Sequence, residues 1–87
     1  MKTSPQEPEP RGGAAPFRIY TGASLGAAIK HYRREAGLSQ AELAARSGLN
    51  RTYLSGVERG KETEQLRRLL RVLRQLGVRI ILQKADW

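Results

Sequence analysis

Two stripes of apolar residues, with members three and four positions apart, predict two amphipathic helices. The first stripe comprises Leu25, Ala28, Ile29 and Tyr32. It predicts a helix from about Leu25 to Ala36. The second stripe comprises Leu66, Leu69, Leu70, Leu73 and Leu76. It predicts a longer helix that is capped by Thr63 and stops at Gly77, and we expect this leucine stripe to be part of the core.

Capping residues mark two shorter helices between these stripes. Ser39 and Glu42 form the S-x-x-E capping box, which predicts a helix that ends at Gly48. Asn50 is the N-cap of the next helix, which ends at Gly60. Two capped helices joined by a turn of about four residues that contains glycine are typical of a helix-turn-helix.

Two short segments have the pattern of strands. Residues 78–82 (VRIIL) are rich in β-branched residues and predict a C-terminal strand. Residues 17–21 (FRIYT) alternate, and they are either a strand or an extended segment packed on the first helix. A lone strand cannot satisfy its own backbone hydrogen bonds. The C-terminal strand therefore pairs with residues 17–21 or with its symmetry mate, where Val78, Ile80 and Leu82 would form the dimer strand.

The sequence therefore predicts a mostly α fold of four helices with a short C-terminal β-strand. At 87 residues the chain is one small domain. Residues 1–16 contain all four prolines and predict a disordered N-terminal arm. Residues 17–83 form the helix-turn-helix domain, with the dimerisation strand at 78–83, and residues 84–87 form a C-terminal tail.

The positive charge is concentrated in the predicted folded domain. The formal net charge is +8, and the charges in residues 1–16 and 84–87 cancel, so the whole excess lies within 17–83. A basic domain with neutral ends indicates a polyanionic partner, for which nucleic acid is the default. The alternative is a charge that only maintains solubility.

The outward face of the third helix carries the candidate base-reading residues. They are Arg51, Thr52, Ser55 and Gly56. An arginine can form two hydrogen bonds to guanine, hydroxyl groups can reach several bases, and glycine permits close approach. Under the alternative interpretation, the chain is a small helical bundle and these side chains are merely solvated.

The segment from Leu38 to Gly60 resembles the Xre/Cro-type repressor family. The match comprises S-Q-x-E-L-A-x-x-x-G, a polar N-cap and a closing x-E-R-G, and the resemblance extends over about residues 25–82. It implies a lambda-repressor-like domain and a homodimeric repressor on palindromic double-stranded DNA. It also implies a structural ion pair between Arg33 and Glu58.

Five further residues are assigned to DNA phosphates. They are Gln40, Asn50, Tyr53, Arg59 and Lys61. Matching positions at the starts of the two helices contact phosphates and base edges in the resembled family. The N-terminus of a helix also favours an anion, which supports the assignment of Gln40. Arg59 and Lys61 follow the third helix and should contact the backbone.

The order of helix-turn-helix, basic leucine-rich helix and terminal strand is similar to the HipB-type antitoxin branch of that family. This resemblance implies an autorepressor that also neutralises a HipA-like kinase toxin. Trp87 could anchor such a partner or pack on its own domain. The arginines of the fourth helix are either solvated or contact an acidic partner. The alternatives are a stand-alone repressor and an interaction module that binds DNA only non-specifically.

The residues for catalysis and metal binding are missing from the sequence. The chain contains no cysteine and one histidine, His31, and Asp86 is its only aspartate. No metal site, nucleophilic triad or paired-carboxylate site is therefore expected, and we predict neither enzymatic activity nor a cofactor. No apolar run reaches the length of a membrane span. The predicted location is the cytoplasm, in association with the nucleoid.

Overall fold

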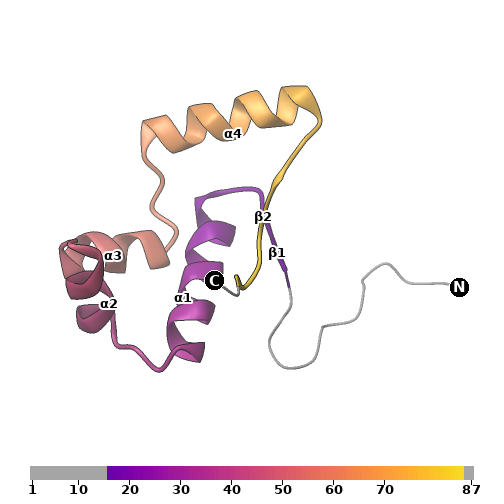
Figure 1. Cartoon of the computed structure of the whole chain (residues 1–87). Coiled ribbons are helices and arrows are strands. Elements are labelled where there is room, and N and C mark those ends of the chain that lie inside the picture. Colours follow the sequence, from indigo (N-terminus) through magenta and orange to yellow (C-terminus); the bar gives the residue numbers. More distant parts are fainter. Residues whose placement is uncertain (1–15, 86–87) are drawn as a thin grey trace, which may run out of the picture.

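The computed structural model describes residues 16–85, which form four helices and two short strands (Figure 1). In chain order these are β1 (Phe17–Ile19), α1 (Gly22–Glu35), α2 (Gln40–Ser47), α3 (Arg51–Glu58), α4 (Glu64–Leu76) and β2 (Ile80–Leu82). The predicted fold class, mostly α with four helices and a short C-terminal strand, is confirmed. The predicted N-terminal arm, apart from Pro16, and the proposed anchor Trp87 lie outside the described residues.

Local capping sets the boundaries of α2 and α3. The Ser39 hydroxyl accepts a hydrogen bond from the Glu42 amide, and the Glu42 carboxylate accepts one from the Ser39 amide, at 3.0 and 2.8 Å. Gly48 ends α2 with a φ of 70°, a conformation that residues with a Cβ rarely adopt. The Asn50 side-chain oxygen accepts the Thr52 amide at 2.7 Å. Both helices therefore start where the capping residues predict.

Helix α1 begins three residues earlier than its apolar stripe predicts. Thr21 is the N-cap, and its side-chain oxygen accepts the Ser24 amide at 3.2 Å. The Ser24 hydroxyl accepts the Thr21 amide at 2.9 Å in return. This capping box has serine at the position usually held by Glu or Gln, and it extends the helix upstream to Gly22.

The two strands pair antiparallel within the chain. Phe17 lies opposite Leu82 and Ile19 opposite Ile80. Of the two pairings left open by the sequence, the described structure contains the one with residues 17–19. Val78 of the predicted dimer strand precedes β2 and is 52% exposed, because the chain leaves α4 at Gly77 and enters the ladder only at Ile80.

The core lies where α1 meets α3 and the strands. Its buried apolar residues are Ile19, Ala28, Ala44, Leu54 and Leu70. Helix α1 approaches the end of α3 through Gly26, where a Cβ would overlap the Val57 carbonyl oxygen and lie 3.0 Å from that of Glu58. The side-chain-free surface of Gly26 thus lets two helix backbones come into direct contact.

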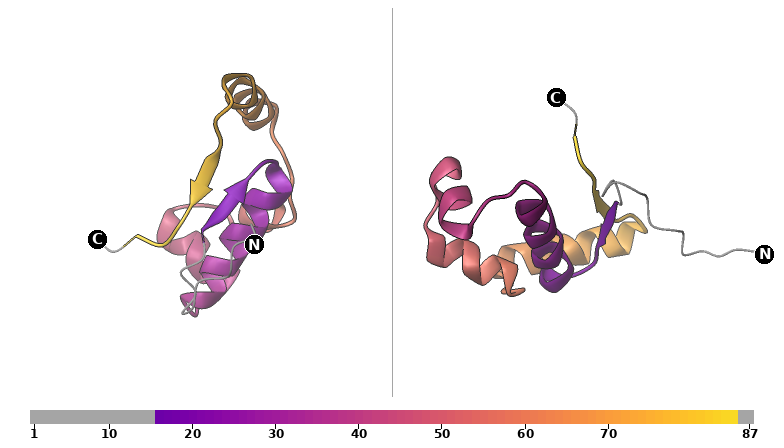
Figure 2. Two further views of the ribbon diagram at one scale, coloured as in Figure 1. Left: turned by 90° about the vertical axis from the view of Figure 1, so that its right-hand side faces the viewer. Right: turned by 90° about the horizontal axis from the view of Figure 1, so that it is seen from below.

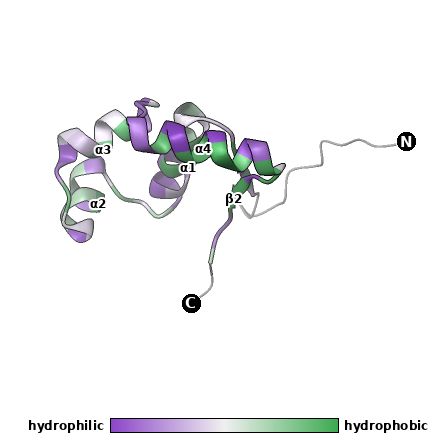
Figure 3. Cartoon of the chain, turned by 90° about the horizontal axis from the view of Figure 1, so that it is seen from above, coloured by the Kyte–Doolittle hydropathy of each residue, from purple (hydrophilic) through white to green (hydrophobic). Residues whose placement is uncertain are grey.

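Helix α4 stands apart from α1, α2 and α3 and returns to the domain through β2 (Figures 1 and 2). Its ribbon alternates between hydrophobic and hydrophilic residues (Figure 3). The expectation that its leucine stripe is part of the core is only partly right. Leu70 is buried and Leu66 and Leu73 are half-buried, whereas Leu69 and Leu76 are 53% and 68% exposed. The stripe is wider than the surface that the small domain offers to it.

Candidate nucleic-acid interface

The first turn of α3 presents three polar or aromatic side chains to solvent. Arg51, Thr52 and Tyr53 are exposed, and Tyr53 is 55% exposed. They lie together because the cap at Asn50 starts the helix immediately before Arg51. A helix whose N-terminal residues are exposed in this way has the geometry that enters a major groove.

The second turn of α3 is less accessible than the sequence predicts. Ser55 is half-buried, and its hydroxyl accepts a hydrogen bond from Arg59 Nη1 at 2.7 Å. Gly56 is buried, with the Lys61 side chain across it and a 3.0 Å hydrogen bond from the Lys61 amide to its carbonyl. Of the four residues assigned to base reading, Arg51 and Thr52 are therefore the exposed ones.

A network of side chains fixes α2 and α3 to α1. Arg33 donates to both carboxylate oxygens of Glu58, from Nε at 2.6 Å and from Nη2 at 3.0 Å, and Nη1 donates to the Leu38 carbonyl at 2.8 Å. The Arg33 and Glu58 side chains are 10% and 3% exposed. The hydrogen bonds from Arg33 lower the pKa of Glu58 below its usual value. The structure therefore contains the ion pair that the resemblance implies.

Gln40 takes part in the same network. Its side-chain amide donates to Glu58 Oε1 at 3.0 Å, so the side chain is directed toward α3. A phosphate at the start of α2 would accordingly meet backbone amides, and Gln40 would position α2 against α3. Asn50 is similarly occupied as a cap, because its side-chain oxygen accepts the Thr52 and Tyr53 amides. The sequence predicted the cap at Asn50 but not the hydrogen bond from Gln40 to Glu58.

A groove of about 580 Å³ runs beside α3 and is a feature that the sequence did not reveal. Leu25 and Ile29 of α1, Tyr53 and Val57 of α3 and Leu66 of α4 are among its lining residues. Leu49, in the turn between α2 and α3, is 48% exposed at this groove.

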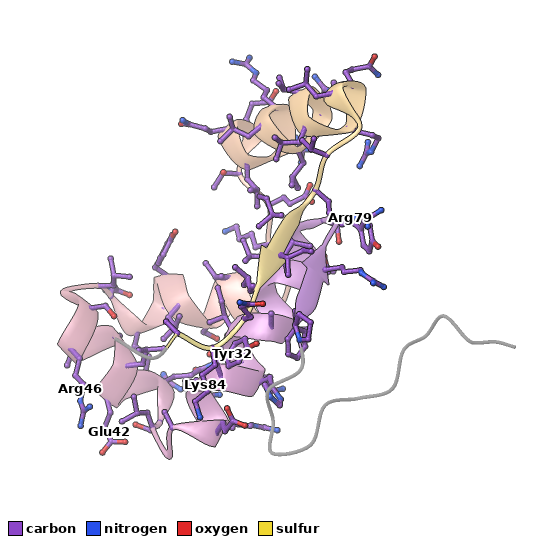
Figure 4. All side chains as sticks on the ribbon, turned by 45° about the vertical axis from the view of Figure 1, so that its right-hand side comes forward. Tyr32, Glu42, Arg46, Arg79 and Lys84 are labelled. Atoms are coloured by element: carbon purple, nitrogen blue, oxygen red, sulfur yellow. The ribbon has the colours of Figure 1, made fainter. Side chains whose placement is uncertain are left out.

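The arginines of α4 and Arg79, which precedes β2, differ in their surroundings. Arg67 and Arg68 both bond to Glu64, at 2.8 and 3.2 Å. Such pairs on an exposed helix contribute little to stability. Arg79 lies 5.6 Å from the centroid of the Tyr20 ring and projects outward from the strands (Figure 4). Arg67, Arg68 and Arg79 are separate from the exposed first turn of α3.

Two features of the described residues bear on other functions. Within residues 16–85, no group of three or more His, Cys, Asp or Glu side chains is placed to hold a metal ion. None of the helices in this range is both long and apolar enough to cross a membrane.

Comparison with known proteins identifies relatives for most of the chain. Residues 29–82 match the family described as helix-turn-helix. The "Uncharacterized HTH-type transcriptional regulator y4mF" of Sinorhizobium fredii is 40% identical over 63 residues, which are 72% of this chain and 83% of that protein. The "ImmF control region 10 kDa protein" of Bacillus phage phi105 is 43% identical over 51 residues, 59% of this chain and 57% of that protein.

A shorter match covers the two-helix motif. The "HTH-type transcriptional regulator SinR" of Bacillus subtilis is 46% identical over 39 residues, which are 45% of this chain and 35% of that protein. No solved structure matches the chain significantly.

Proposed function

Because the chain belongs to the helix-turn-helix family, we propose that it is a DNA-binding transcription regulator that recognises a specific sequence through α3. The observation that carries the proposal is the exposure of Arg51 and Thr52 at the start of a capped helix. The net charge of +8 supports a DNA partner, because counterion release drives binding to phosphates. The relatives named as transcription regulators support the same role.

The proposed regulator is a repressor that acts as a homodimer on a palindromic site. A two-fold axis would match two half-sites about 34 Å apart, one helical turn of DNA. We assign base contacts to Arg51 and Thr52, with Ser55 at the edge of that surface, and phosphate contacts to Tyr53 and Lys61. The protein would act at the nucleoid in the cytoplasm and would not be an enzyme.

The test is fluorescence anisotropy with the duplex upstream of the protein's own gene and with a shuffled duplex, at physiological salt. We expect a preference of about 10³ or more for the upstream duplex. Equal binding to both duplexes, lost as salt rises, would instead identify a module that only grips phosphates. That outcome would refute the proposed function.

Two substitutions separate base reading from phosphate contact. Arg51→Ala should weaken binding to the upstream duplex by about 1–3 kcal/mol and reduce the preference over shuffled DNA, since a bidentate base contact is lost. Lys61→Ala should weaken binding to both duplexes alike and reduce the salt slope by about one. Arg71→Ala removes one charge from α4, away from α3, and is the charge-matched control. An equal loss for both duplexes with Arg51→Ala would refute its assigned role.

We propose a narrower role, the antitoxin of a HipBA-like module, as a second candidate. Its support is the order of helix-turn-helix, basic leucine-rich helix and terminal strand, which is similar to HipB-type antitoxins. A neighbouring gene for a kinase-like protein, and co-purification of its product with this chain, would favour this role. Trp87→Ala would then test the proposed anchor. The absence of a neighbouring gene for a kinase-like protein would favour a stand-alone Xre-type repressor.

A further inference from the structure

Helix α4 has a wide apolar stripe, and residues 16–85 cover only one edge of it. Leu66, Leu70 and Leu73 face the domain, where Leu70 and Leu73 line the gap between α4 and the strands. Leu69, Val72 and Leu76 face away and are 53%, 55% and 68% exposed. We call these three residues the outer face of α4. No other element of the described chain lies on the side of α4 that is turned away from α1, α2 and α3 (Figure 1).

The outer face itself carries no charged residue, although α4 is strongly basic and the exposed Arg68, about 40° from Val72, borders the face. At about 100° per residue, its three side chains fall within roughly 60° of one another. Arg67, Arg71 and Arg74 fall on the opposite side of α4 by the same count. An acidic protein would therefore be attracted to the arginines and would leave the outer face uncovered.

We infer that the outer face of α4 is the surface on which a second copy of this chain docks, with the two α4 helices antiparallel. Two copies that each carry a net charge of +8 repel one another, and this face brings them together without a cation at its centre. Antiparallel helix dipoles add a small attraction. The inference deepens the proposed function and rests on it in part, because a palindromic site requires a two-fold axis.

The exposed apolar area is close to the area that a standard dimer interface requires. The outer face and the adjoining Val78, which is 52% exposed, offer roughly 400 Å² of apolar surface per copy. A standard interface buries about 800 Å² per partner, of which about 56–65% is apolar. The face therefore supplies most of the apolar core of such an interface, and the polar residues that flank it supply the rim.

Sedimentation equilibrium of the full chain tests the surface. Leu69→Gln with Leu76→Gln keeps the size and helix propensity of both positions and leaves the charge unchanged. We expect this double variant to raise the dimer dissociation constant at least tenfold. Ile81→Gln is the matched control, because Ile81 is 49% exposed on the strands and would report a dimer formed there. A wild-type monomer at millimolar concentration, or a loss confined to Ile81→Gln, would overturn the inference.

A cross-linking experiment keeps the inference testable if the double variant folds poorly. When Leu69 packs against Leu76 of the second copy, the symmetry axis passes beside Val72. The chain contains no cysteine, so Val72→Cys introduces a single thiol. We expect mild oxidation to link the copies through this thiol and to leave Arg71→Cys, on the opposite side of α4, as monomers. Equal linking of both variants would contradict the assignment of the outer face of α4 as the dimer surface.

Salt separates the dimer from DNA binding. Added salt should tighten the dimer, because it screens repulsion between the two cationic copies, whereas it should weaken DNA binding through counterion competition. A dimer without sequence preference would refute the proposed function and leave the surface assignment intact. Sequence-specific binding by a chain that still dimerises equally well after Leu69→Gln and Leu76→Gln would refute the surface assignment alone. Sequence-specific binding by a chain that never dimerises would refute the surface assignment and the homodimer, and would leave the sequence-specific regulator intact.

Discussion

The contact of α1 with α3 and the outer side of α4 place apolar and charged groups in opposite environments. At the first, Gly26 brings two backbones together and the Glu58 carboxylate is 3% exposed beside Arg33. At the second, Leu76 is 68% exposed and the nearby cations are solvated. The comparison shows that the close packing of this small domain holds α2 and α3 in a fixed position against α1. The outer side of α4 is left unpacked and is free to associate with another surface.

The largest expected effect comes from breaking the ion pair at the first contact. Glu58→Ala leaves the Arg33 guanidinium nearly buried without its partner, which should lower the free energy of unfolding by about 3–5 kcal/mol. Urea unfolding followed by circular dichroism at pH 7 measures this loss. Glu64→Ala, which removes the exposed partner of Arg67 and Arg68, should change stability by less than about 0.5 kcal/mol. Similar costs for both variants would remove the contrast between the two regions.

The same carboxylate should make the fold sensitive to acid. The pKa of Glu58 is lowered in the folded chain by hydrogen bonds from Arg33, from an ordinary value of 4.5. Its contribution is therefore fully present above pH 4.5 and is lost as the pH falls through the lower, folded pKa. Stability measured by urea unfolding should decline below pH 4.5, and more steeply in the wild type than in Glu58→Gln. Parallel declines in the two proteins would show that other groups cause the acid sensitivity.

The next effect tests the close approach of α1 and α3. Gly26→Ala should destabilise the fold by about 2–3 kcal/mol, because the added Cβ overlaps the Val57 carbonyl and two packed backbones must separate. In an isolated helix the same change is stabilising by about 1 kcal/mol, so the sign of the effect is diagnostic. Ala27→Gly, at the exposed neighbouring position, is the control. It should lower the free energy of unfolding only by the difference in helix propensity between Ala and Gly, about 1 kcal/mol. Thermal unfolding of both variants decides the question.

The sequence predicts those parts of the fold that depend on neighbours along the chain. The boundaries of α2 and the cap of α3 followed from Ser39, Glu42 and Asn50, because a cap bonds to amides two or three residues away. The same cap places Arg51 and Thr52 in the first turn of α3, where the sequence predicted that they are exposed. Such information is local and does not require knowledge of the packing.

The remaining features depend on contacts between distant residues. The sequence shows that α4 has an apolar stripe, but only the packing decides that Leu70 is covered and that Leu76 is not. The role of Gln40 as a partner of Glu58, and the burial of Gly56 beneath Lys61, likewise depend on how α2, α3 and the following loop meet. Gly26 gave no signal, because a glycine within a helix does not indicate what lies against it.

The smallest expected effect on the stability of the monomer belongs to Leu76→Ala, which we compare with Leu70→Ala on the same helix. Leu70→Ala should lower the free energy of unfolding by about 2–3 kcal/mol, since Leu70 is 7% exposed and truncation of its side chain leaves a cavity. Leu76→Ala on the same helix should change the stability of the monomer by less than about 0.5 kcal/mol. Thermal unfolding at low micromolar concentration measures both changes.

At higher protein concentration the unfolding temperature of the wild type should rise, because only the folded chain forms the dimer. Leu76→Ala should weaken that dependence, and a wild-type unfolding temperature that is independent of concentration would show that the outer face of α4 has no partner among copies of this chain.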